Sequence, residues 1–217
     1  MHISTVLFLA SVAVAGGVAL AALVREDRPG FALFKPLTTF IVLLGAAYLI
    51  RPAAQPYRSW IVLGLALSLA GDVLLLPTVD RFRAGLAAFL LAHVAYLGAF
   101  TLSSPVARAQ LPLLAPFVLF GGAAVLAAWP GLGARRVPVL AYLVVVCAMA
   151  WRAAARGGAP GVSPASFRLA LAGASLFLVS DAILLVRRFR LPSRTAHTVE
   201  LGLYWVAQTL LALSVRS

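Results

Sequence analysis

The sequence is organised around one short stretch, Ser68-Leu69-Ala70-Gly71-Asp72-Val73-Leu74-Leu75-Leu76. This stretch places a carboxylate inside a run that is too apolar for anything but a membrane-buried segment. A similar pattern of a small residue, an aspartate and an apolar run recurs around Asp181. An ionisable side chain in hydrocarbon costs about 2.5–3.5 kcal/mol on insertion scales, so such residues face the interior of a helix bundle and mark function. Asp72 and Asp181 are therefore our candidate catalytic residues.

The composition indicates an integral membrane protein. Of the 217 residues, 63% are hydrophobic and 11% charged, and the mean hydropathy is +1.01, whereas soluble domains average about 25% charged residues. The net charge of +12 comes from basic residues scattered singly or in pairs, which argues against a nucleic-acid partner. Cys147 is the single cysteine, so no intramolecular disulfide and no cysteine cluster for a metal can form. We expect no metal and no cofactor.

Eight apolar runs have roughly the length of a membrane span, and charged or helix-breaking segments separate them. The expected fold is an all-α integral membrane protein, an eight-helix transmembrane bundle formed by a single transmembrane domain over residues 1–217. The N-terminal run lacks a basic segment before it and is expected to remain as the first helix. The runs are Ser4–Val24, Phe34–Ile50, Trp60–Leu76, Ala84–Leu102, Leu111–Trp129, Val137–Trp151, Phe167–Val186 and Val199–Val215.

Eight spans would place both termini on one side of the membrane, and the basic residues indicate which side. By the positive-inside rule, the side with more Lys and Arg is cytoplasmic. The termini are therefore expected outside the cytoplasm, with the chain in the bacterial inner membrane. The side opposite the termini holds eleven basic residues: Arg25, Arg28, Lys35, Arg81, Arg83, Arg135, Arg136, Arg187, Arg188, Arg190 and Arg194. The side of the termini holds seven: Arg51, Arg58, Arg108, Arg152, Arg156, Arg168 and Arg216.

The two aspartates occupy matching places in this arrangement. Asp72 lies five residues before Pro77, and Asp181 lies six before Arg187. At 1.5 Å per residue, each is about 7–9 Å inside the cytoplasmic end of its helix. Their helices are third in each half of the chain, as a parallel four-plus-four internal repeat requires.

Polar residues at helical spacing are expected to face the aspartates. Gly85, Phe89, His93 and Tyr96 share one helix face, and His197, Glu200, Tyr204 and Gln208 share another. The bland alternatives are that His93 and Tyr96 bond neighbouring helices, that Lys35 snorkels to the interface, and that His197 and Glu200 are solvated. The candidate substrate-binding residues are Lys35, His93, Tyr96, Tyr142, Ser180, Tyr204 and Gln208.

An ordered set of motifs along most of the chain resembles the YhhN family, the family of the transmembrane protein 86 lysoplasmalogenases. The motifs are Lys35-Pro36-Leu37-Thr38-Thr39, Gly71-Asp72-Val73-Leu74-Leu75, Phe82-Arg83-Ala84-Gly85 with Phe89, His93 and Tyr96, Phe177-Leu178-Val179-Ser180-Asp181, and Tyr204-Trp205-Val206-Ala207-Gln208. The resemblance implies hydrolysis of the vinyl ether bond of lysoplasmalogens, which yields a fatty aldehyde and a glycerophospho-headgroup. It also implies a lysophospholipid substrate taken from the bilayer.

Two carboxyl groups suit this reaction on chemical grounds. A vinyl ether is hydrolysed by protonation of the alkene carbon remote from the oxygen, which gives an oxocarbenium ion that water attacks. Two nearby carboxyl groups in low dielectric hold one proton between them and can supply both acid and base. Because Ser180 precedes Asp181 and its hydroxyl could bond a carboxylate, we expect Asp72 to be the acid. Lys35 and the arginines at the cytoplasmic rim, Arg81, Arg83 and Arg187, are expected to attract the lipid phosphate.

Two other functions fit the same residues. A proton-coupled transporter for lipids or small molecules can also combine parallel repeats with intramembrane acids. A hydrolase acting on another ether or epoxide lipid would use the same acid and carboxylate. Release of aldehyde from a lysoplasmalogen would distinguish the hydrolase from a transporter. Assays on a panel of lysolipids would distinguish a lysoplasmalogenase from a hydrolase of another ether or epoxide lipid.

The orientation in the membrane can be tested by cysteine accessibility in a Cys147→Ala background. Because the basic residues concentrate opposite the termini, a Ser217→Cys thiol should react with a membrane-impermeant reagent from the non-cytoplasmic side. Labelling from the cytoplasm alone would show that the orientation is the opposite of the expected one. It would not change the candidate site residues.

Overall fold

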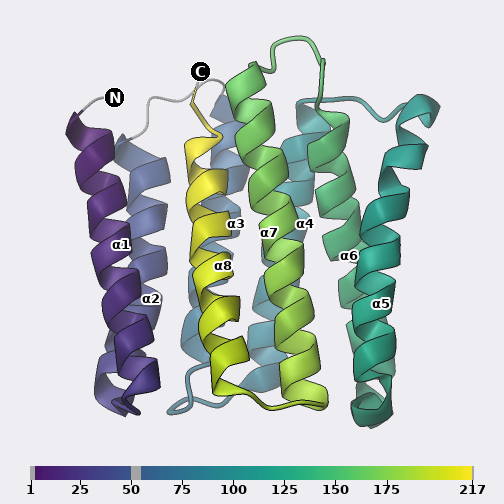
Figure 1. Ribbon diagram of the computed structural model, residues 1–217. Helices are drawn as coiled ribbons and strands as arrows, with labels where there is room; N and C mark the ends of the chain where they lie inside the picture. The colour runs from purple at the N-terminus through teal and green to yellow at the C-terminus, as the bar shows by residue number, and fades with distance from the viewer. Residues whose placement is uncertain (1–2, 50–54, 217) are drawn as a thin grey trace.

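The computed structural model describes residues 3–49 and 55–216, which form a bundle of α-helices (Figure 1). Each expected apolar run overlaps one of them; Ile50, the last residue of the second run, and Arg51 lie outside the described residues. The short segments are the π-helical turn η1 (Gly45–Leu49) and the 3-10 turns η2 (Arg108–Leu114) and η3 (Gly133–Arg135). The α-helices are α1 (Ile3–Val24), α2 (Arg28–Leu44), α3 (Gln55–Leu74), α4 (Phe82–Leu102), α5 (Ala115–Leu132), α6 (Arg136–Ala155), α7 (Pro164–Phe189) and α8 (Arg194–Leu213).

Consecutive α-helices run in opposite directions, so α1 begins and α8 ends at the same end of the bundle (Figure 1). Helix α3 packs on α4, α7 on α8 and α1 on α2. Helix α8 also contacts α1, α2 and α3, which joins the two halves of the chain. Helix α5 packs on α6 and α7 and forms the opposite edge of the bundle from α1 (Figure 1).

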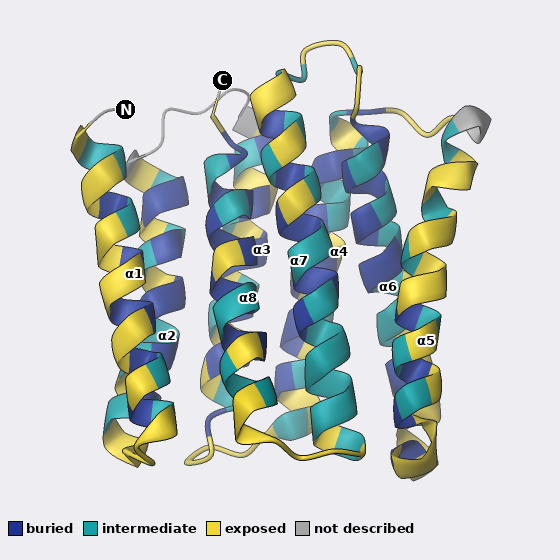
Figure 2. Ribbon diagram, in the orientation of Figure 1, coloured by how far each residue is buried: buried dark blue, intermediate teal, exposed yellow. Residues whose placement is uncertain are grey.

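The chain is a multi-pass integral membrane protein. Among the described residues, six helical segments are long and apolar enough to cross a membrane. One of them, Gln110–Ala155, is 46 residues long and includes both α5 and α6, whereas α8 is not among the six. The edge helices α1 and α5 are exposed along much of their length (Figure 2). The exposed side chains of α5 include the large apolar Leu119 and Leu126. Hydrocarbon is the environment in which such a surface is stable.

Helix α2 begins earlier than the expected run. Asp27 caps it by accepting a hydrogen bond from the Gly30 backbone at 3.1 Å, and Pro29 occupies its first turn. Pro36, which would stand in the first turn of a helix that began at Phe34, therefore lies inside the helix. A proline there donates no backbone hydrogen bond, so it weakens the helix beside Lys35.

Close packing of α3 against α4 turns aromatic side chains of α4 inward. A Cβ on Gly64 would lie 2.2 Å from the ring of Tyr96, and one on Gly71 would lie 2.6 Å from the ring of Phe89. No side chain larger than hydrogen fits at such distances without movement of the ring. The Phe89 ring of α4 therefore packs directly against the backbone of α3 at Gly71, the residue before Asp72.

Two arginines counted among the basic residues near the termini are buried. Arg152 and Arg156 are 1% and 2% exposed. The guanidinium of Arg156 donates to the Tyr57 hydroxyl at 3.0 Å and to Ser166 Oγ at 3.1 Å, and Ser166 donates to the Ser214 carbonyl at 2.6 Å. These bonds tie α3, α6, α7 and α8 together at the end of the bundle opposite the aspartates.

Candidate active site

Asp72 lies in the last turn of α3 and is 1% exposed. Lys35 Nζ lies 3.3 Å from its Oδ1, and the hydroxyls of Thr39 and Tyr204 donate to its Oδ2 at 2.6 and 2.7 Å. An ammonium group and two hydroxyls from α2 and α8 thus surround one carboxyl group. Donors in this number favour the ionised carboxylate, which can only accept hydrogen bonds.

Lys35, which we expected to attract the lipid phosphate, lies inside the bundle against Asp72. Its side chain is buried at 6% exposure, and Nζ also donates to the Asp72 backbone carbonyl at 3.2 Å. Because α2 begins at Arg28, Lys35 lies two turns into the helix and not at its start. Its ammonium compensates the buried charge of Asp72.

Asp181 lies in the interior of α7, eight residues before the helix ends at Phe189. The Tyr142 hydroxyl donates to its Oδ2 at 2.9 Å, and His93 Nε2 lies 3.3 Å from the same oxygen. Among the described residues, no Lys or Arg forms an ion pair with Asp181. The two aspartates therefore have different surroundings, one charged and one of neutral polar groups.

The two carboxyl groups have separate hydrogen-bond partners, and within the described residues no hydrogen bond joins them. Aromatic rings connect their surroundings instead. The Tyr204 ring lies 5.5 Å from that of Phe177, which lies 4.5 Å from the His93 ring, both in edge-to-face geometry. We expected the two aspartates to share a single proton. Within the described residues, no direct contact between the two carboxyl groups supports that expectation.

The remaining candidate residues divide into two groups. His93, Tyr142 and Tyr204 reach the aspartates, as described above. The other three bond neighbouring helices: Tyr96 donates to Gln208 Oε1 at 2.7 Å, and Ser180 donates to the Glu200 carbonyl at 2.9 Å. Tyr96 thus follows the structural alternative, in which it bonds a neighbouring helix, here through Gln208 of α8.

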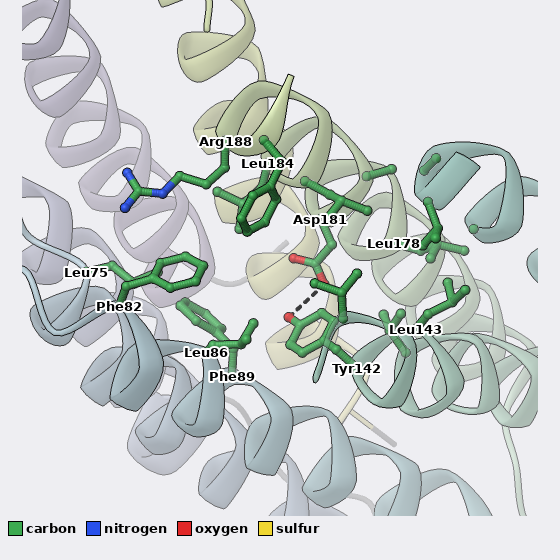
Figure 3. A pocket seen from close by; sticks show the side chains of 18 residues that line it. Leu75, Phe82, Leu86, Phe89, Tyr142, Leu143, Leu178, Asp181, Leu184 and Arg188 are labelled. Atoms are coloured by element: carbon green, nitrogen blue, oxygen red, sulfur yellow. Dashed lines mark hydrogen bonds between the residues drawn. The ribbon is translucent and has the colours of Figure 1, made fainter. Parts of the chain in front are cut away.

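An apolar pocket lies between α4, α5, α6 and α7 (Figure 3). Its walls are leucine, valine and phenylalanine side chains, including Leu86, Phe89 and Leu178. Asp181 and Tyr142 line it side by side, joined by the hydrogen bond that the dashed line in Figure 3 marks, and Arg188 adds a charged group to the lining. Asp72 does not line this pocket.

A basic pocket adjoins the apolar one at the end of the bundle away from the termini. Phe82, Arg188 and Phe189 line both pockets. The guanidinium of Arg188 stacks over the Phe82 ring at 4.9 Å, and the two phenylalanine rings meet edge to face at 6.1 Å. The basic pocket is also lined by Asp80, Arg81, Arg83 and Arg135.

The sequence identified only part of this basic pocket. Arg81 and Arg83 were expected there, but Arg187 turns away and pairs with Glu200 at 2.6 Å. Arg188 and Arg135 were missed. They stand in basic pairs on the expected side of the membrane, and only the helical phase decides which member of each pair faces the pocket.

The fold and site define a polytopic membrane protein in which a partly buried carboxyl group lines an apolar pocket that adjoins a basic one. Among the described residues, no cluster of three or more His, Cys, Asp or Glu side chains could hold a metal ion. The YhhN family matches residues 30–215, and the chain belongs to this family.

Proteins named lysoplasmalogenases are among the relatives of this chain. The chain is 32% identical to human "Lysoplasmalogenase TMEM86B" over 193 residues, covering 88% of this chain and 78% of the relative. It is 30% identical to human "Lysoplasmalogenase TMEM86A", covering 82% and 72%. It is 27% identical to "Uncharacterized membrane protein YhhN" of Escherichia coli O157:H7, covering 84% and 86%. No solved structure matches the chain.

The ion pair of Lys35 and Asp72 can be tested by a double-mutant cycle. Lys35→Met and Asp72→Asn should each lower the free energy of unfolding by about 3–5 kcal/mol, because each leaves a buried charge without its partner. The double variant should lose much less than the sum. Asp181→Asn serves as the matched control, because no Lys or Arg in the described part of the chain pairs with that carboxyl group. Thermal unfolding in detergent gives the comparison, and additive losses would show that the two side chains do not interact.

Proposed function

We propose that this chain hydrolyses the vinyl ether bond of lysoplasmalogens. The observation that carries the proposal is the apolar pocket with Asp181 in its wall, adjoining a pocket of four arginines. A lysoplasmalogen has the matching parts, since it carries an apolar chain, a vinyl ether and a phosphate in that order. Relatives named lysoplasmalogenases support the same reading.

In the proposed complex, the phosphate binds at the basic pocket and the chain enters the apolar one. Guanidinium groups suit a phosphate because they form paired, charge-assisted hydrogen bonds. Asp181 and Arg188 are seven residues apart on α7, about 10 Å along the helix axis. The glycerol backbone of the lipid would lie along this interval, with its vinyl ether beside Asp181.

The proposed reaction begins with Asp181 as a protonated acid. Its O–H bond breaks as a C–H bond forms at the alkene carbon remote from the ether oxygen, and the remaining π electrons leave an oxocarbenium ion. The new carboxylate stabilises this cation and then accepts a proton from the water that attacks it. The hemiacetal collapses to a fatty aldehyde and the glycerol hydroxyl of the headgroup product.

The surroundings of the two aspartates favour Asp181 as the acid, the reverse of our expectation from the sequence. Asp72 accepts hydrogen bonds from Thr39 and Tyr204 and pairs with Lys35, all of which favour its ionised form. Asp181 forms no ion pair with a Lys or Arg of the described residues and lines the apolar pocket. In this mechanism Asp72 holds Tyr204 in place, the Tyr204 ring packs on Phe177, and the Phe177 ring packs on His93.

We propose that all the helices α1 to α8 cross the membrane as a parallel four-plus-four repeat. In support, the paired contacts recur in the two halves, with α3 on α4 matching α7 on α8. The end that carries the basic pocket would face the cytoplasm of a bacterial cell, with the termini outside. Substrate would then reach the site from the cytoplasmic leaflet.

The proposal predicts aldehyde release by the purified protein in detergent. A lysoplasmalogen should yield aldehyde, whereas the matched lysolipid with a saturated ether should not, because it has no alkene carbon to protonate. Asp181→Asn should lower kcat by about 10²–10⁴-fold with little change in KM, the range for loss of a general acid.

Two further variants separate chemistry from binding in the same assay. Glu26→Gln, an equivalent carboxyl-to-amide change at an exposed loop residue, should leave both constants unchanged. Arg188→Ala should raise KM more than it lowers kcat. A purified, folded protein that releases no aldehyde would contradict the proposed activity, and binding of the lipid without turnover would favour a carrier.

A further inference from the structure

The His93 ring is held in one tautomer. Its Nδ1 lies 2.6 Å from the backbone carbonyl of Phe89, one turn earlier on α4. A carbonyl oxygen only accepts hydrogen bonds, so Nδ1 must carry a proton. The ring also packs edge to face on Phe177 at 4.5 Å and on Tyr142 at 5.2 Å, which keeps it in this orientation.

The other ring nitrogen faces the candidate acid. His93 is 0% exposed, and its Nε2 has no hydrogen-bond partner although it lies 3.3 Å from Asp181 Oδ2. In a neutral imidazole protonated at Nδ1, Nε2 presents a lone pair. A lone pair facing a carboxylate oxygen is repulsive, and a buried polar atom without a partner is costly. A proton between the two atoms removes both costs.

We propose that His93 and Asp181 share one mobile proton between Nε2 and Oδ2, and that His93 thereby keeps Asp181 in its acid form. This inference rests on the proposed vinyl ether hydrolysis, in which Asp181 is the acid. His93 would be a positioning residue, because it acts on the substrate only through Asp181. It does not line the apolar pocket, whereas Asp181 does.

The polar and charged groups around His93 and Asp181 are compatible with a proton shared between Nε2 and Oδ2. Tyr142 on α6 donates to the same oxygen, Oδ2, and so holds the carboxyl group toward the histidine. Glu200 on α8 is engaged by Arg187. Arg188 lines the pocket from α7 but forms no ion pair with Asp181. The pocket-lining residues of α5, Gly121, Ala124 and Val125, carry no charge.

The shared proton gives the catalytic cycle a balanced return step. When Asp181 protonates the alkene carbon, its O–H bond breaks and its carboxylate is left facing the Nε2 lone pair. That arrangement is unfavourable, so the carboxylate readily takes the proton of the attacking water. The water O–H bond then breaks, a C–O bond forms, and the Asp181 O–H bond is restored. One water is consumed, and the pair neither gains nor loses a proton over the cycle.

The proton can be detected without turnover. The infrared difference spectrum, wild type minus the Asp181→Asn variant, should contain the C=O stretching band of a carboxylic acid. This band should shift when H₂O is replaced by D₂O. In His93→Phe the band should move to the frequency of a carboxylic acid that donates no hydrogen bond, or disappear. Histidine ¹⁵N NMR, with His93 assigned by its absence in the variant, should report a protonated Nδ1 and an Nε2 signal that changes in Asp181→Asn.

Kinetics provide a second readout with a matched control. His93→Phe should lower kcat by about 10–100-fold at little changed KM, the effect of losing one strong hydrogen bond to the acid. The matched change is His197→Phe. His197 lines neither pocket and packs edge to face on Phe31 at 5.9 Å, so this change should leave activity unchanged. The proposal is overturned by a wild-type protein with no carboxylic acid band from Asp181, by a His93 proton on Nε2 with Nδ1 bare, or by an Nε2 signal indifferent to Asp181→Asn. Because these spectra need no substrate, they test the inference even if the chain releases no aldehyde.

Discussion

The structure depends on how buried charge is compensated inside an apolar bundle. A carboxylate in hydrocarbon is stable only when cations or donors surround it, and Asp72 receives both from Lys35, Thr39 and Tyr204. These partners come from α2 and α8, so the compensation also ties the N-terminal helices to the last one. Asp181 solves the same problem differently, because its neighbours are the neutral groups of Tyr142 and His93.

This difference divides the work of the two aspartates. A carboxyl group with neutral polar neighbours in an apolar pocket can keep a proton and give it to an apolar substrate, whereas one paired with a lysine holds a charge in place. Aromatic packing keeps the two aspartates apart. The Phe89 ring packs on Gly71, and the Phe177 and Tyr204 rings lie between the partners of Asp72 and those of Asp181. The fold therefore keeps the charged pair away from the pocket that the lipid chain would enter.

Much of the fold and part of the site follow from the sequence. Each apolar run overlaps a helix, although α2 begins at Arg28 and not at Phe34, and the cost of burying an ionisable group singled out Asp72 and Asp181. The partners of each aspartate could not be predicted, because they depend on helix rotation and on contacts between helices far apart in the chain. Lys35 is an example: the sequence placed it near a helix start, but the cap at Asp27 moves that start two turns earlier. The same limit applies to Arg187 and Arg188, where one residue of helical phase separates an internal ion pair from the pocket wall.

The central claim is that the lipid chain lies beside Asp181 and the phosphate lies among the arginines of the basic pocket. The most direct measurement is an experimental structure with a lysophospholipid analogue whose saturated ether resists hydrolysis. The account predicts the ether oxygen and its adjoining chain carbons in contact with the Asp181 carboxyl group, and the phosphate within hydrogen-bond distance of Arg188. An analogue seated against Lys35 and Asp72, or with its chain outside the apolar pocket, would contradict it.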